Sequence, residues 1–220
     1  MIAAELISNV IPPLKTSDTV QKALDRMSEF KLYHLPIVNE TQFLGLVSED
    51  ELIEIRDHET PIGTLSLAII NPFVFEDTHV YDVIRLFSQL QLSLVPVLDL
   101  NKNYLGVVSI NNLFTYTADT YAVKEPGGII VLSISNRNNS LAHMAQIVEA
   151  DNAQILSSYV SSFPDSTKLE ITLKINKTEL SGIISSFERY NYEVKAVFNN
   201  SQNDDGSTDR FNSFMNYLNV

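Results

Sequence analysis

The sequence predicts an α+β protein in two parts: a duplicated unit with pseudo-two-fold symmetry, followed by a smaller unit of order βαββαβ. The first observation is an internal repeat, because the pattern of residues 20–38 returns at residues 80–98. The second is the break Lys-Glu-Pro-Gly-Gly at residues 124–128, after which the hydrophobic rhythm changes. A copied supersecondary unit packs against its copy, so we expect the functional cleft between the two copies.

The composition is that of a globular protein and excludes several classes of function. The chain has 220 residues, enough to bury a core without a metal or a disulfide, and it contains no Cys. Its formal net charge of −12 repels polyanions, so we expect neither nucleic acid nor an anionic membrane as a partner. We expect a cytoplasmic protein, since the sequence shows no signal peptide and no apolar run of the roughly 18 residues that a membrane span requires.

The first copy begins with an apolar-periodic segment, residues 3–10, which is closed by Pro12 and Pro13. An amphipathic helix follows, because apolar residues recur at the i, i+3, i+4, i+7 spacing and residues 17–19 supply capping oxygens. Ser48 is placed to cap a second helix. The expected elements are a helix at residues 20–30, strands at 35–38 and 43–47, and a helix from 49 to about 56.

The second copy repeats this order. Its leading segment spans residues 61–70, Pro72 aligns with Pro12, and residues 77–78 supply the capping oxygens of the next helix. Ser109 leads into the last helix of the copy. The expected elements are a helix at residues 80–90, strands at 95–98 and 104–108, and a helix that runs past residue 113.

The third part has the order βαββαβ of a ferredoxin-like unit. One of its strands alternates apolar and polar residues, which indicates a solvent-facing side. The expected elements are a strand at residues 129–135, a helix from 140, hairpin strands at 155–162 and 169–175 around a turn at 163–167, a helix from 178 and a strand at 192–198. Residues 199–208 are polar, and residues 209–220 have the pattern of a short amphipathic helix that needs a partner surface. We therefore expect four segments: 1–60, 61–124, 125–199 and 200–220.

Three features recur in the same order in both copies: a helix of the pattern V-x-x-A-L-x-x-M or its apolar counterpart, a strand h-P-h-h in which h is apolar, and the motif G-h-h-S-x-x-[N/D], complete in the second copy and with Glu at the last position in the first. In these features residues 1–120 resemble cystathionine-β-synthase (CBS) domains. Together the copies resemble a Bateman-type module. This resemblance implies a CBS-domain pair that binds a small-molecule effector between its lobes, an adenosine nucleotide such as AMP, ADP or ATP.

Residues 128–199 resemble an ACT domain, a regulatory module that pairs side by side and in some proteins binds amino acids. The D-x-P-G-x-L turn of that family falls on residues 136–141, where Asn139 stands in place of Gly. Without Gly, the close backbone approach that an amino-acid ligand needs is disfavoured. A CBS pair followed by an ACT-like domain resembles the acetoin-utilization (AcuB-type) family, which implies a regulatory homodimer and not an enzyme.

The resemblance also implies where a nucleotide binds. In nucleotide-binding CBS pairs the Ser or Thr of the motif contacts phosphate, and the final Asp or Asn contacts the ribose hydroxyls. The chemistry is suitable, because a hydroxyl beside the free amides of a helix start favours an anion, and an amide side chain can bond a diol. The second copy carries the whole motif as Gly106, Ser109 and Asn112.

The first copy departs from the motif, since Gly45 and Ser48 are followed by Glu51. Glu is one methylene longer than Asp, so we weight the second site above the first. The scarcity of cations near either motif argues against a triphosphate. The remaining candidates, which would wall the adenine or lie beside it, are Pro36, Ile37, Pro96, Val97, Pro12, Pro72 and His34.

Simpler interpretations stay open. Ser48 and Ser109 can serve only as helix caps, and His34 can be a hydrogen-bonded structural residue. The four histidines form no H-x-x-x-H or H-x-H pair, so we expect no metal. The sequence has no G-x-S-x-G elbow and no Gly-rich phosphate loop, so we expect no catalytic residue and no resident cofactor. The alternative functions are an interaction module that dimerises and docks on a partner without a ligand, and amino-acid binding at the ACT-like interface.

Overall fold

The computed structural model describes residues 1–66, 70–134, 140–163 and 168–199. The chain divides into two compact units, Met1–Thr117 and Ala118–Val220. The predicted turn at residues 136–139, most of the hairpin turn at 163–167 and the helix at 209–220 lie outside the described residues. The limits of the four segments remain predictions.

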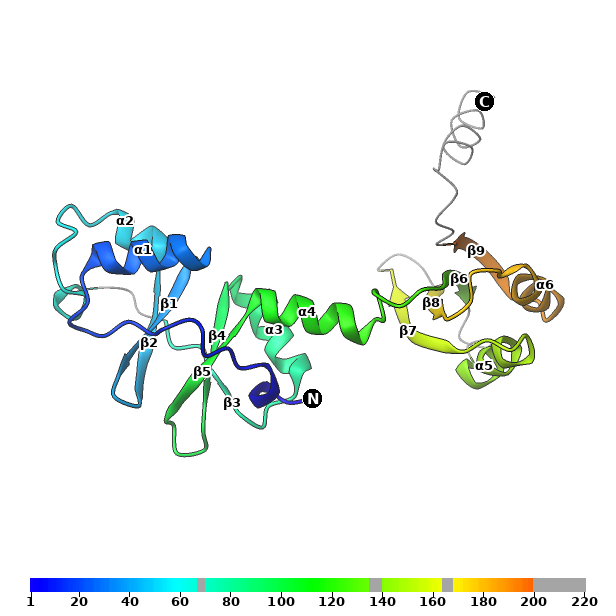
Figure 1. Ribbon diagram of the computed structural model, residues 1–220, viewed down its shortest axis with the longest axis horizontal. Helices are drawn as coiled ribbons and strands as arrows, with labels where there is room; N and C mark the ends of the chain where they lie inside the picture. The colour runs from blue at the N-terminus through cyan, green and yellow to red at the C-terminus, as the bar shows by residue number, and fades with distance from the viewer. Residues whose placement is uncertain (67–69, 135–139, 164–167, 200–220) are drawn as a thin grey trace, which may run out of the picture. The chain divides into compact units, whose positions relative to one another are not determined.

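The first unit holds two copies of one arrangement (Figure 1), in which a helix precedes an antiparallel hairpin and a second helix follows it. The first copy consists of η1 (Ala3–Leu6), α1 (Val20–Phe30), β1 (His34–Asn39), β2 (Gln42–Ser48) and α2 (Glu49–Ile53). The second consists of η2 (Ile62–Thr64), β3 (Val74–Phe75), α3 (Val80–Leu90), β4 (Leu94–Leu98), β5 (Tyr104–Ser109) and α4 (Ile110–Thr120). The predicted duplication is therefore confirmed.

The two hairpins also share a bulge. Gly45 pairs with Ile37 and Gly106 pairs with Val97, and in each hairpin the register shifts directly after that pair. The φ angles of the two glycines are 147° and 151°. These angles favour Gly over residues with a Cβ, so the glycine of each motif bends its hairpin at the same point.

The leading segment of each copy bonds to a strand of the other copy. The Ser8 amide donates to the Val107 carbonyl at 2.7 Å, and the Leu46 amide donates to the Ile70 carbonyl at 2.8 Å. The buried side chains of both copies also belong to one hydrophobic cluster. The copies are thus interlocked and share one core.

Helices α1 and α3 follow the predicted apolar spacing but are capped differently. The Thr19 hydroxyl of α1 accepts from the Lys22 amide at 3.3 Å, within the predicted capping segment. For α3 the prediction of a cap at residues 77–78 is wrong, because His79 Nδ1 accepts from the Tyr81 amide at 3.3 Å. Thr78 is engaged earlier, since its hydroxyl accepts from the Phe75 amide at 3.1 Å. The buried positions are Val20, Ala23 and Met27 in α1 and Val80, Val83 and Phe87 in α3.

Helix α2 ends at Ile53, earlier than predicted, because the Ile55 amide bonds to the Leu52 carbonyl at 3.2 Å in a tighter turn. Strand β3 was not predicted. It has two residues, too few for a pattern, and it pairs in parallel with β4.

The second unit has the predicted ferredoxin-like fold. It consists of β6 (Gly128–Ile134), α5 (Leu141–Ala150), β7 (Ile155–Ser162), β8 (Leu169–Ile175), α6 (Ser181–Arg189) and β9 (Glu193–Phe198). The strands lie in the order β7-β8-β6-β9, and every neighbouring pair is antiparallel. Helix α6 begins after the predicted residue 178, since the Glu179 carboxylate accepts from the Ser181 amide at 3.0 Å in the preceding turn.

Burial alternates along β6, so one face of this sheet is covered and the other is not. Side chains of both helices share a core with the covered face. Representative members of this core are Ile130, Leu132, Met144, Leu173 and Phe187.

Candidate functional site

The motif of the second copy lies where β5 passes into α4. The Ser109 hydroxyl accepts from the Asn112 amide at 3.2 Å and donates to Asn112 Oδ1, so it caps α4. Ser109 is only 4% exposed. Ser109, the predicted phosphate contact, is therefore also a structural helix cap. Its hydroxyl and the Asn112 side chain form one small polar cluster.

The leading segment of the first copy completes this cluster. Asn112 Nδ2 lies 3.5 Å from the Leu6 carbonyl, at the outer limit of a hydrogen bond. A Cβ added at Gly106 would lie 2.5 Å from Ile7 Cγ2 and 3.2 Å from Asn9 Oδ1. Gly106 is thus required for close approach as well as for its φ. Residues 6–9 and 106–112 therefore meet at one place, although they come from different copies.

The motif of the first copy has the same geometry but a different charge. The Ser48 hydroxyl donates to Glu51 Oε2 at 3.0 Å and accepts from the Glu51 amide at 3.4 Å. The first turn of α2 also carries Glu49 and Asp50, whereas the first turn of α4 has no acidic residue. Negative charge repels phosphate, so the electrostatics favour the second motif over the first.

The candidate wall residues lie in matching strands. Pro36 and Pro96 pair with Leu46 and Val107 across their hairpins. Both prolines are buried, as are Ile37 and Val97, while Pro72 is half-buried ahead of β3 and Pro12 is half-buried in the leading segment. Pro36 and Pro96 thus occupy equivalent positions in the two hairpins.

His34 joins the two copies. Its Nδ1 lies 3.3 Å from the Ser93 hydroxyl and accepts from the Ser93 amide at 3.4 Å. The Ser93 hydroxyl in turn accepts from the amides of Tyr33 and His34 at 3.1 and 3.0 Å. Burial lowers the pKa of His34 below 6.5, and the carboxylates of Asp50 and Glu51 oppose this in part. Burial thus disfavours the protonated imidazole at the contact between the copies.

The sequence did not single out Ser93, Leu6 or Asn9, which these contacts make part of the site. Their positions depend on how the two copies meet, and single-residue contacts leave no periodic signal.

Two sizeable cavities among the described residues lie away from both motifs. One of ≈ 790 Å³ adjoins Lys15, Ser17 and the β1–β2 turn. The other, of ≈ 450 Å³, lies in the second unit.

Within the described ranges, no three His, Asp or Glu side chains converge as the ligands of a metal ion would. No helix in the same ranges combines the length and apolar character that crossing a membrane requires.

The family model of the CBS domain matches the sequence twice, at residues 3–58 and 66–119, which together make up half of the chain. Each match corresponds to one copy of the internal repeat.

Several crystal structures are similar to about half of this chain. A CBS domain pair/ACT domain protein from Thermotoga maritima is 21% identical over 54% of this chain and 98% of that chain, with a TM-score of 0.49. A protein assigned to acetoin utilization (AcuB) from Vibrio cholerae is 16% identical over 56% of this chain and 95% of that chain, with a TM-score of 0.50. CBSX2, in complex with AMP, is 19% identical over 54% of this chain and 96% of that chain, with a TM-score of 0.47. At these identities the similarity concerns the fold alone.

A curated protein, the DNA topoisomerase 2 of African swine fever virus, is 20% identical over 123 residues, or 56% of this chain. The chain spans 10% of the length of that protein.

Proposed function

Because this chain belongs to the CBS-domain family, we propose that it is a non-enzymatic regulatory protein that binds an adenosine nucleotide between its two CBS domains. The nucleotide class is AMP, ADP or ATP. The observation that carries the proposal is the cluster of Ser109, Asn112 and the Leu6 carbonyl, in which two copies supply polar groups to one place.

The cluster suits a ribose phosphate. Helix α4 has 11 residues and no acidic residue in its first turn, so its N-terminal amides favour an anion. The contact between Asn112 and Leu6 is long at 3.5 Å, and a ribose hydroxyl can replace it at little cost. The proposed binding residues are Gly106, Ser109, Asn112, Pro96, Val97 and Pro72.

The first motif is the weaker candidate. Its helix has five residues and three carboxylates in its first turn, and Ser48 already donates to one of them. Its residues would be Gly45, Ser48, Glu51, Pro36 and His34. A nucleotide here must displace the Glu51 carboxylate or bind beside it.

A nucleotide bound at the second motif would contact both copies, because the cluster of Ser109, Asn112 and the Leu6 carbonyl contains groups from each. Binding that tightens residues 6–9 against β5 would stabilise the whole interlocked unit. We further propose that the protein acts as a homodimer whose ACT-like unit passes this change to a partner.

Thermal unfolding of the full chain with AMP, ADP, ATP and S-adenosylmethionine tests the proposal. A ligand present at about a hundred times its Kd adds about 2.7 kcal/mol to the free energy of unfolding. For a chain of this size that raises the Tm by several degrees. If none of the four compounds raises the Tm, the nucleotide proposal is wrong.

Matched double substitutions locate the site. Ser109→Ala with Asn112→Ala removes the polar groups of the second motif, and Ser48→Ala with Glu51→Ala makes the equivalent change in the first. Each pair removes one helix cap, at a cost of about 1 kcal/mol. The nucleotide-dependent rise in Tm should disappear in the Ser109→Ala, Asn112→Ala protein and persist in the Ser48→Ala, Glu51→Ala protein. The opposite result would move the site to the first copy.

One observation favours the alternative of an interaction module without ligand. Ser109 and Ser48 are both engaged as helix caps, so neither motif needs a ligand to satisfy its polar atoms. Under this alternative the Tm is insensitive to all nucleotides, while the protein still dimerises. Amino-acid binding at the ACT-like interface stays a variant, and its expected turn lies outside the described residues.

A further inference from the structure

The second unit has a sheet face that its own helices leave uncovered. Helices α5 and α6 pack on one face, and the alternate residues of the strands point to the other. The register places Ile129, Lys174 and Ser157 side by side on three neighbouring strands of that other face. Thr172 and Tyr159 form the next row.

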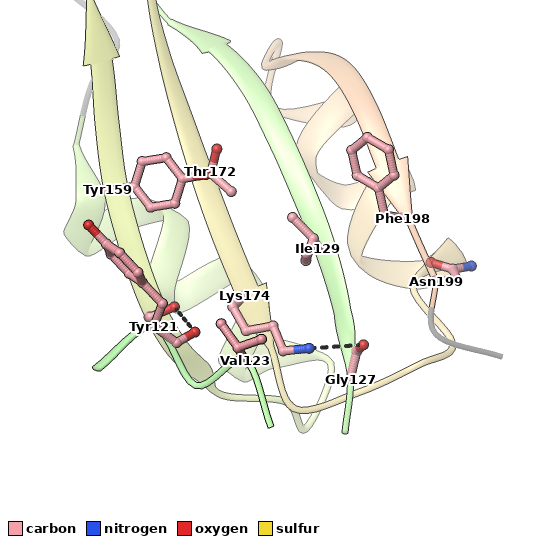
Figure 2. A pocket seen from close by; sticks show the side chains of 10 residues that line it. Tyr121, Val123, Gly127, Ile129, Tyr159, Thr172, Lys174, Phe198 and Asn199 are labelled. Atoms are coloured by element: carbon pink, nitrogen blue, oxygen red, sulfur yellow. Dashed lines mark hydrogen bonds between the residues drawn. The ribbon is translucent and has the colours of Figure 1, made fainter. Parts of the chain in front are cut away.

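A cavity of ≈ 450 Å³ lies on this uncovered face (Figure 2). This volume falls in the range of roughly 300–1,000 Å³ that is typical of small-molecule sites. Its rim is apolar and aromatic: Tyr121, Tyr159, Phe198 and Val123 are 42%, 45%, 59% and 63% exposed. Side chains of this kind that gather around a hollow mark a binding surface.

The rim is held in place by defined contacts. The rings of Tyr121 and Tyr159 lie 5.4 Å apart between centroids, in a tilted arrangement. The Ser157 hydroxyl donates to the Tyr121 carbonyl at 2.9 Å, which fixes the segment before β6 against strand β7. The cavity is therefore preformed and does not depend on a ligand to order its walls.

Lys174 supplies a buried positive charge to this cavity. Its side chain lies in the lining, the residue is only 8% exposed, and its ammonium donates to the Gly127 carbonyl at 3.3 Å (Figure 2). A lysine ammonium has three donors. None of the ion pairs formed among the described residues includes Lys174. A buried cation without a carboxylate is costly, so an anionic ligand is favoured here.

The carboxylates of the same sheet are engaged elsewhere. Glu170 pairs with Lys195, and Glu193 pairs with Lys168 at 3.0 Å. The described lining of the cavity contains neither Asp nor Glu. A ligand that carries an ammonium group would therefore find a cation and no carboxylate in this cavity.

We propose that this cavity binds a small carboxylate with an apolar or aromatic tail and no amino group. The carboxylate pairs with the Lys174 ammonium, and the Thr172 hydroxyl lies in the same lining as a further donor. The tail lies among the aromatic and aliphatic side chains of the rim. This site is independent of the nucleotide proposal, because the unit, the ligand and the residues all differ.

Isothermal titration of the full chain with three phenyl compounds tests the ligand class. Phenylacetate carries only the carboxylate, 2-phenylethylamine only the ammonium, and L-phenylalanine both. We expect saturable binding of phenylacetate. 2-Phenylethylamine lacks the charge-assisted hydrogen bond to Lys174, and L-phenylalanine brings an ammonium group that finds no carboxylate in the lining, so each should bind at least about tenfold more weakly. Equal binding of the amine, or no binding of phenylacetate, would overturn the inference.

Three variants locate the site. Lys174→Met removes the charge, keeps an unbranched side chain one atom shorter, and should weaken phenylacetate binding about tenfold to a hundredfold. Lys195→Met removes an equal charge from the same sheet, outside the cavity, and should leave binding unchanged. Because Lys174→Met can also perturb folding, Val123→Glu places a carboxylate on the exposed rim and should weaken binding as well. Unchanged affinity in both Lys174→Met and Val123→Glu would overturn the site.

A second copy of the chain is the competing occupant of this face. In that case phenylacetate gives no heat, and Val123→Glu converts a dimer to a monomer in sedimentation equilibrium. That pair of results would contradict the ligand site.

Discussion

The close approach of Gly106 to the leading segment of the first copy gives a sharp prediction for Gly106→Ala. The φ of Gly106 is 151°, and an added Cβ would lie 2.5 Å from Ile7 Cγ2. A residue with a Cβ at such an angle costs about 1–3 kcal/mol. Forcing a methyl group into an occupied space costs about 1–3 kcal/mol more. We therefore expect Gly106→Ala to lower the free energy of unfolding by about 2–6 kcal/mol.

A second substitution separates the two costs. Ile7→Ala removes the Cγ2 atom that the new methyl group would meet. In that background the backbone cost of about 1–3 kcal/mol remains, with a smaller cost for the 3.2 Å approach to Asn9 Oδ1, so Gly106→Ala should cost less than it does with Ile7. The difference between the two backgrounds measures the contact between the first copy and β5 of the second.

Urea unfolding followed by circular dichroism, with linear extrapolation to water, gives the four free energies of this cycle. The m value should stay the same in all four proteins, because the fold is unchanged. If Gly106→Ala costs the same with Ile7 and with Ala at position 7, the leading segment does not pack on β5 and the interlocked arrangement is wrong.

Three further predictions concern polar groups of the first unit. Ser93→Ala leaves the buried amides of Tyr33 and His34 without an acceptor and should cost about 1–3 kcal/mol in urea unfolding; a cost near zero would contradict the contact. Burial lowers the pKa of His34, so in proton NMR this imidazole should titrate below its ordinary 6.5, and its contribution to stability is lost as the pH falls below that value; a pKa above 6.5 would contradict the burial of His34. Burial alone would raise the pKa of Asp18, but a bond from the Lys15 amide and two cationic side chains lower it below 3.8. Its contribution is therefore present above pH 3.8 and lost in acid, and Asp18→Asn should flatten the acid dependence of unfolding; an unchanged slope would contradict this.

The repeat, the helices and the hairpins could be predicted because each leaves a periodic or paired signal in the sequence. Val20, Ala23 and Met27 recur at helical spacing because one side of α1 is buried. The glycines of the two motifs mark their bulges because only Gly tolerates their backbone angles. The cap of α3 could not be predicted, because the turn at Phe75 engages the hydroxyl that the pattern assigned to the helix.

The contacts of the candidate site were only partly predictable. The pairing of Ser109 with Asn112 follows from their spacing of one helical turn, whereas the arrival of Leu6 depends on the exchange of leading segments. In the second unit, the alternating pattern of β8 indicated a solvent-facing side. Lys174 lies on that side and is nevertheless buried, because the segment around Tyr121 and Val123 borders it. That segment has no periodic pattern of its own, so the cavity could not be predicted.

Nitrogen–proton NMR spectra of the full chain during titration with AMP test the central claim most directly. We predict saturable shifts of the backbone amides at residues 109–112 together with those at residues 6–9, because one ligand would touch both copies. Spectra that do not change, or shifts confined to residues 48–51, would contradict the account.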